Sequence, residues 1–135
     1  MAYITSFTYC DSIQSEVTQQ GISYQPVTPL QVLAPMAIPG NYTFAIFCSI
    51  SGLEPGMENS AQFLFIAESD TVVYDTQLIR FQISPEQIEL NKPAVMQFNL
   101  DLRNMRLCET GTYKTRVFVN QELIGEYKIP VIVGE

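Results

Sequence analysis

The sequence predicts an all-β fold: a single antiparallel two-sheet sandwich of about seven to nine strands that spans residues 1–135. The last quarter of the chain, from Gly111 to Val133, has the alternating pattern of two strands joined by a polar turn. Short apolar stretches separated by Gly, Pro and polar turns recur through the rest, and almost none has helical spacing. Because a hairpin cannot cover its own buried face, a second sheet must pack against it.

The first third of the chain predicts strands of uneven quality. Residues 2–9 alternate in polarity and predict a first strand at a sheet edge, whereas the polar residues 11–20 predict a loop or a short helical turn. Residues 21–39 contain four prolines, which cannot donate to a sheet ladder, so we expect an edge or an extended cover over the core. Residues 42–51 give the best strand pattern of the first half, with Tyr42, Phe44, Ile46, Cys48 and Ile50 on one face and Thr43, Ala45, Phe47, Ser49 and Ser51 on the other.

The middle of the chain predicts a central strand and two shorter ones. After an acidic Gly/Pro loop at residues 52–60, residues 61–67 are apolar on both faces, which is typical of a strand covered on both sides. Further short strands are expected at residues 72–74 and 77–83.

A turn or short helix is expected next. In residues 84–87 a Ser at the N-cap precedes a Pro at the first helical position, which is the pattern of a helix start. Residues 94–102 then alternate as a strand with its apolar side chains facing inward. We expect residues 103–107, which carry two arginines, to form a loop.

One short motif indicates the type of sandwich. The residues Glu109, Gly111, Tyr113 and Thr115, each separated by one position, are similar to the tyrosine corner of immunoglobulin-like sandwiches. The resemblance implies that the glycine permits a tight corner and that the tyrosine enters the core, where its hydroxyl bonds a backbone group upstream. Thr115 stands where an antibody domain has cysteine, so the resemblance covers the immunoglobulin-like architecture and not the antibody type.

The layout of the whole chain resembles an uncharacterised family of short bacterial and phage-associated β-sandwich proteins, a domain of unknown function. The features that carry this resemblance are Tyr9-Cys10-Asp11, Gly21-Ile22-Ser23, Pro39-x-x-Tyr42-x-Phe44, and the hairpin from Gly111-x-Tyr113 to Leu123-Ile124-Gly125. It supports the fold and implies no activity.

Charge is distributed unevenly along the chain. The net charge is −7, and no Lys or Arg occurs before Arg80. Residues 1–79 hold seven acids, for a charge of −7, and residues 80–135 hold seven acids and seven bases, which cancel. Nucleic acids and anionic membranes attract basic surfaces, so we expect neither as a partner.

The sequence lacks the residues that several kinds of catalytic and metal site require. Histidine is absent, which removes Ser-His and Cys-His pairs and most zinc sites. Cys10, Cys48 and Cys108 are an odd number without CxxC spacing, so structural thiols are expected in preference to a disulfide or metal site. We therefore expect no catalytic residues, no metal and no cofactor. With no secretory signal and no apolar run of about 20 residues, a cytoplasmic protein is expected.

The acids of the first half are the candidate partner-binding residues. These are Glu54, Glu58, Glu68, Asp70 and Asp75. They could form a solvated face, or a calcium site in the loop of Glu54 and Glu58 or in the turn of Glu68 and Asp70. They could also supply a pair for acid–base catalysis, such as Glu68 with Asp70. The expected function is a non-enzymatic protein-interaction module, an accessory or inhibitor protein of a phage or mobile element that binds a basic partner through this acidic surface. The alternative is a self-assembling structural sandwich, a homo-oligomer that uses a strand edge or the Pro-rich segment.

Overall fold

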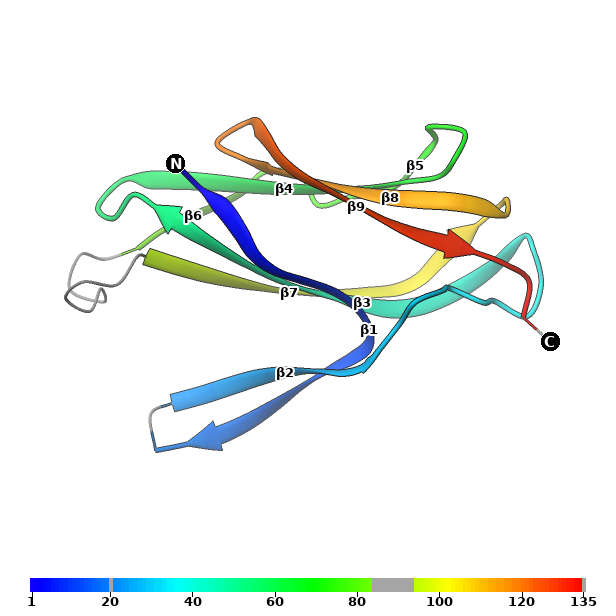
Figure 1. Cartoon of the computed structure of the whole chain (residues 1–135), viewed down its shortest axis with the longest axis horizontal. Helices are drawn as coiled ribbons and strands as arrows, with labels where there is room; N and C mark the ends of the chain where they lie inside the picture. Colours follow the sequence, from blue (N-terminus) through cyan, green and yellow to red (C-terminus); the bar gives the residue numbers. More distant parts are fainter. Residues whose placement is uncertain (20, 84–93, 135) are drawn as a thin grey trace.

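Two sheets pack face to face in the computed structural model of this chain, which describes residues 1–19, 21–83 and 94–134 (Figure 1). The strands are β1 (Tyr3–Thr18), β2 (Gly21–Pro29), β3 (Gly40–Leu53), β4 (Glu58–Ile66), β5 (Val72–Asp75), β6 (Ile79–Gln82), β7 (Ala94–Leu107), β8 (Gly111–Val119) and β9 (Glu122–Val131). The predicted all-β sandwich is confirmed. Among the described residues there is no helix of the length and apolar character needed to cross a membrane.

The strands divide into a four-stranded and a five-stranded sheet. The first sheet has the order β2-β1-β3-β7, and the second has the order β5-β4-β8-β9, with β6 also paired to β4. The first half of β1 lies beside β9 and connects the two sheets through side-chain contacts. There the Tyr9 hydroxyl lies 2.6 Å from Thr115 Oγ1 and donates to the Tyr127 carbonyl at 2.9 Å, and the Phe7 ring stacks on Tyr127.

The core lies between the inner faces of the two sheets, as the alternation of the sequence predicts. The β3 residues Phe44, Ile46, Cys48 and Ile50 are all buried, and so are the opposing residues Phe63 and Phe65 of β4 and Val117 of β8. The central position predicted for residues 61–67 is confirmed, since β4 pairs with β8 on one side and with β5 and β6 on the other.

The tyrosine corner is present. Tyr113 is fully buried, and its hydroxyl donates a hydrogen bond to the Glu109 carbonyl at 2.7 Å. Gly111 has a φ of +134°, and a Cβ placed there would overlap the Glu68 side chain. The corner therefore needs glycine for its backbone conformation, whereas the exposed Glu68 side chain could move aside.

The prediction for residues 11–20 was wrong as far as Thr18. β1 continues to that residue and pairs with β2, from Cys10 opposite Pro29 to Thr18 opposite Gly21. We call residues 11–18 together with β2 the arm, because this end of the first sheet extends away from the region where the two sheets pack face to face (Figure 1). The polar pattern concealed a strand because most side chains of the arm face water. The edge position expected for the Pro-rich segment is confirmed for β2.

Residues 103–107 were also predicted wrongly. β7 continues through them and pairs with the start of β3, with Leu107 opposite Gly40. Arg103 and Arg106 are exposed on this strand, while Leu107 is buried. A strand with one solvated face accepts such charges, so they do not mark its end. The helix start predicted at residues 84–87 lies outside the described residues.

Candidate protein-interaction surfaces

The described residues contain no group of three or more His, Cys, Asp or Glu side chains that could hold a metal ion. Cys10 and Cys48 are buried, Cys108 is exposed, and all three are free thiols. Burial raises the pKa of the Cys48 thiol to about 12, and it also raises the pKa of the Tyr9 hydroxyl. Both groups are thus held neutral inside the core, where their role is packing and hydrogen bonding.

The structure separates four of the five predicted binding acids into two groups, and the fifth, Asp75, lies at the end of β5. Glu54 lies in the turn before β4 and Glu58 at its first residue, whereas Glu68 and Asp70 lie in the turn after its last residue. The nine residues of β4 put these two ends roughly 30 Å apart. The acids of the first half therefore do not form one continuous patch.

The contacts of these acids also differ. Glu58 lies 4.0 Å from the Arg80 guanidinium and Asp70 lies 3.5 Å from the Lys114 ammonium, and both carboxylates are exposed to water. Such pairs exchange readily with other charged groups, because exposed ion pairs contribute at most about 1 kcal/mol. Asp75 instead accepts hydrogen bonds from the Gln62 side chain at 2.9 Å and the Gln77 amide at 2.7 Å. Its carboxylate has a structural role.

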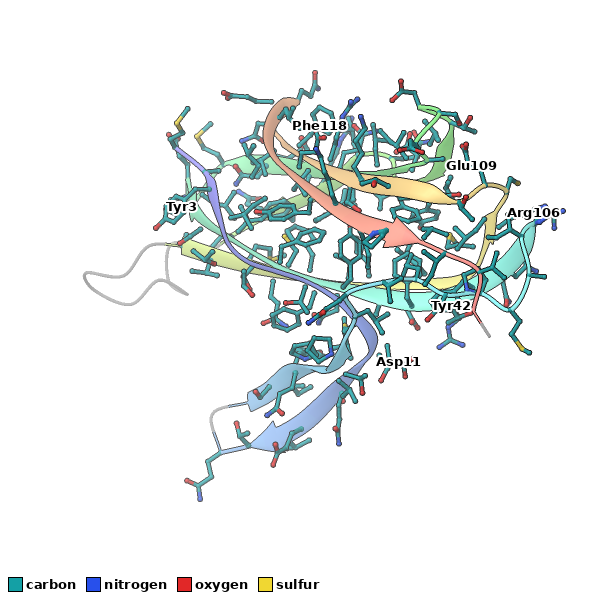
Figure 2. All side chains as sticks on the ribbon, turned by 45° about the vertical axis from the view of Figure 1, so that its right-hand side comes forward. Tyr3, Asp11, Tyr42, Arg106, Glu109 and Phe118 are labelled. Carbon is teal, nitrogen blue, oxygen red and sulfur yellow. The ribbon has the colours of Figure 1, made fainter. Side chains whose placement is uncertain are left out.

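A pocket of about 270 Å³ lies at the Glu54 end of the sandwich. We call it the end pocket. Its lining consists of Met1, Ala2, Gly52, Leu53, Glu54, Met57, Asn59, Val119, Asn120, Glu122 and Ile124. Two carboxylates, those of Glu54 and Glu122, belong to this lining, and none of the described lining residues is Lys or Arg. Figure 2 labels Tyr3, which adjoins Gly52 at this end, and Glu109, which lies at the other end of the sandwich.

Local hydrogen bonds hold the two turns that form the end pocket. In the β3–β4 turn, the buried Asn59 amide donates to the carbonyls of Glu54 at 3.1 Å and Met57 at 3.2 Å. In the β8–β9 turn, the Asn120 side chain accepts from the Ser60 amide of β4 at 2.9 Å. Both turns are therefore anchored to β4, which brings Glu54 and Glu122 to one pocket.

Glu122 is the residue that the sequence alone does not indicate. It belongs to the half of the chain in which charges cancel, and 68 positions separate it from Glu54. The feature that could have indicated Glu122 is the tight turn before it, in which Asn120 and Gln121 both adopt positive φ. Such a turn returns the chain at once, so Glu122 pairs with Val119 beside the start of β4.

The lining of the end pocket suits a basic side chain. Leu53, Met57 and Ile124 offer apolar contact to an aliphatic stem, and the two carboxylates can pair with a cation at its end. Lys and Arg bind in this way, because their methylene stems favour apolar surface while their charged heads remain near water or a counter-charge.

The arm is a second exposed surface, with two chemically different faces. Residues directly opposite in an antiparallel pair share a face. Ile13 opposite Pro26 and Val17 opposite Ile22 therefore form an apolar face that also carries Ser15 and Tyr24, while Gln14, Glu16, Ser23 and Gln25 form a polar one. Val17 is 84% exposed and Ile22 is 61% exposed. A groove of about 370 Å³ separates part of the apolar face from the outer side of β3 and β7.

Comparison with known proteins supports the fold. No protein family and no curated protein sequence matches the chain. An immunoglobulin-like protein of Pseudomonas aeruginosa is similar in structure, with a TM-score of 0.50 and 13% identity over 98% of this chain and 97% of that one. The Pseudomonas fluorescens alkylpurine DNA glycosylase AlkC, solved bound to DNA containing an abasic site analog, gives a TM-score of 0.51 and 9% identity over 96% of this chain. This chain spans 30% of the glycosylase's length. The fold is thus an immunoglobulin-like two-sheet sandwich, as it is in the bacterial protein of similar length.

Proposed function

We propose that this protein is a non-enzymatic, cytoplasmic protein-interaction module that binds a basic partner through the end pocket, where Glu54 of the acidic first half and Glu122 of the second half line one site. The observation that carries the proposal is the lining of this pocket, in which Glu54 and Glu122 accompany Leu53, Met57 and Ile124, and in which no described residue is Lys or Arg. A Lys or Arg side chain of the partner would place its stem on the apolar residues and its cation between the carboxylates.

The charge of the whole chain supports a basic partner. A net charge of −7 attracts a basic protein over a distance of about one Debye length and repels acidic ones. The DNA bound by the glycosylase is a property of that protein. We do not extend it to this chain, because binding to phosphates requires a basic footprint and residues 1–79 contain no Lys or Arg.

The proposal extends to the biological setting through the resemblance described above. We place the protein among accessory or inhibitor proteins of phage or mobile elements, which act by occupying a host protein. An acidic module fits this role, since many host enzymes that act on nucleic acids have basic surfaces.

The test is capture of a partner from host lysate by three forms of the protein, at low and at high salt, with quantification by mass spectrometry. The variant Glu54→Lys/Glu122→Lys reverses the carboxylates of the end pocket. The variant Glu68→Lys/Asp70→Lys makes the same change in charge at the other end of β4. We expect the natural chain and the second variant to retain a stoichiometric partner at low salt, and the first variant to lose it. High salt should release the partner from the natural chain and from the second variant.

This pair of variants separates a local site from a general effect of charge. Equal loss in both would show that only net charge matters, and unchanged capture by Glu54→Lys/Glu122→Lys would overturn the end pocket as the binding site. All four acids are exposed, so we expect both variants to fold, which their thermal unfolding would verify.

A further inference from the structure

The arm has a strand edge that lacks a neighbour. β1 pairs with β3 only as far as Cys10, opposite Ala45. Beyond that point residues 11–17 have β2 on one side, and no other strand of the described residues pairs with them. A two-stranded hairpin is marginally stable in water, and three or more strands with an apolar face are needed for independent stability. The arm is therefore an incomplete sheet.

The two edges of the arm are protected differently. β2 carries Pro26 and Pro29, which have no amide hydrogen and so interrupt the donors that another strand would need. Residues 11–17 of β1 contain no Pro and no Lys, the residues that commonly block an edge. Towards the tip of the arm, both views place β1 on the margin farther from the sandwich, with β2 nearer to it (Figures 1 and 2). Because Ser12, Ile13 and Ser15 also line the groove beside β3 and β7, another strand would approach β1 from the margin away from that groove.

We propose that the occupant of this edge is the same edge of a second copy of the chain, paired antiparallel around a two-fold axis at Ser15. In this register Ser15 faces Ser15 of the second copy, and Ile13 faces Val17 of the second copy on the apolar face. On the polar face Gln14 faces Glu16 of the second copy. Each apolar residue meets an apolar one, and the carboxylate meets an amide donor.

Other registers are less favourable. A shift of one residue places the apolar Ile13 opposite Glu16, because side chains alternate between the faces of a strand. A shift of two residues in one direction sets the two Glu16 carboxylates opposite each other. The same shift in the other direction sets Ile13 opposite Ser15. The register with its two-fold axis at Ser15 is thus the one that avoids both like charges and mixed pairs.

The product is a four-stranded sheet with the order β2-β1-β1-β2. Its apolar face joins Ile13, Val17, Ile22 and Tyr24 of both copies. Asp11 and Glu16 are the only charged residues of the arm, so this surface offers little to the basic partner of the end pocket. Pairing over a few residues lies below about 1,200 Å² of buried area, the range of transient complexes. The self-association uses a different surface from the proposed function and stands independently of it.

The test uses a cysteine at the two-fold axis. Residues that face each other across an antiparallel pair have Cβ atoms about 4.5–5.5 Å apart, close to disulfide geometry. A Ser15→Cys variant should therefore form a disulfide-linked dimer under mild oxidation, in a chain that also carries Cys108→Ser to remove the exposed thiol. The control is Ser12→Cys in the same background, because the register puts the two Ser12 positions about 20 Å apart.

We expect the Ser15→Cys dimer to form at least about tenfold faster than the Ser12→Cys dimer, since pairing raises the local thiol concentration. Equal rates in the two variants would overturn the register. Sedimentation of the natural chain should show a dimer that higher salt strengthens, because two chains of charge −7 repel each other less when screened.

A Val17→Lys variant checks the interface without a disulfide. Val17 is 84% exposed, so the substitution should leave the fold intact while it places a charge in the apolar pair. We expect this variant to remain monomeric and still to capture the partner of the end pocket. If the natural chain stayed monomeric at about 1 mM, a concentration above the Kd of most transient complexes, the proposed self-association would be overturned. The proposal for the end pocket would be unaffected.

Discussion

Replacing Tyr113 with alanine is expected to lower the free energy of unfolding by about 3–5 kcal/mol, the usual cost of removing a buried aromatic ring. Tyr113 is fully buried, and the centroid of its ring lies 5.4 Å from the centroid of the Phe65 ring. Removing it leaves a cavity at the corner where β8 begins. Because a domain of this size is typically stable by only about 5–15 kcal/mol, the loss should be obvious in urea unfolding followed by fluorescence or circular dichroism.

The Tyr113→Phe variant separates the hydroxyl group from the ring. It keeps the packing and removes the hydrogen bond to the Glu109 carbonyl, so we expect a loss of about 1 kcal/mol. If Tyr113→Phe were as damaging as Tyr113→Ala, the hydroxyl rather than the buried ring would dominate the corner, contrary to this account.

Replacing Phe44 with alanine is expected to cost a similar amount, about 3–5 kcal/mol. The Phe44 ring is fully buried and lies within 6.3 Å of the Tyr9, Tyr42 and Phe65 rings. These neighbours come from β1, β3 and β4, so the side chain connects both sheets. Urea unfolding again provides the measurement.

Phe47 offers a matched control on the same strand. It lies on the outer face of β3, opposite Thr8 and Asn99, and is only partly buried. We expect Phe47→Ala to cost less than half as much as Phe44→Ala, since its removal opens no enclosed cavity. Equal costs would mean that the outer face is packed as tightly as the core.

The fold is largely predictable from the sequence where one face of a strand is buried. In residues 42–51 the apolar side chains of Phe44, Ile46, Cys48 and Ile50 are buried as the alternation predicts, although Ala45 at an odd position is buried as well. The β8–β9 hairpin is predictable for the same reason, whereas the corner at Tyr113 was predicted from its resemblance to the tyrosine-corner motif. In these segments the local pattern and the tertiary packing agree.

The arm and the site are less accessible to sequence reasoning. Residues 11–18 face water on most sides, so their strand depends on pairing with β2, which leaves little trace in a polar sequence. The candidate site depends on distant contacts. Glu122 reaches Glu54 only because both turns bond to β4, and Glu68 and Asp70 are separated from Glu54 by the length of that strand. Neither of these spatial relations can be obtained by counting charges along the sequence.

The most direct test of the end pocket is the methionine methyl spectrum during titration with a pentalysine peptide at low salt. The chain has five methionines, of which Met1 and Met57 line the pocket and Met36 is exposed in the connection between β2 and β3. We expect the Met57 methyl signal to shift to saturation while that of Met36 stays in place, and Glu54→Gln/Glu122→Gln to abolish the shift. Shifts of equal size at Met57 and Met36, or no shift at Met57, would contradict a basic-side-chain site at this end of the sandwich.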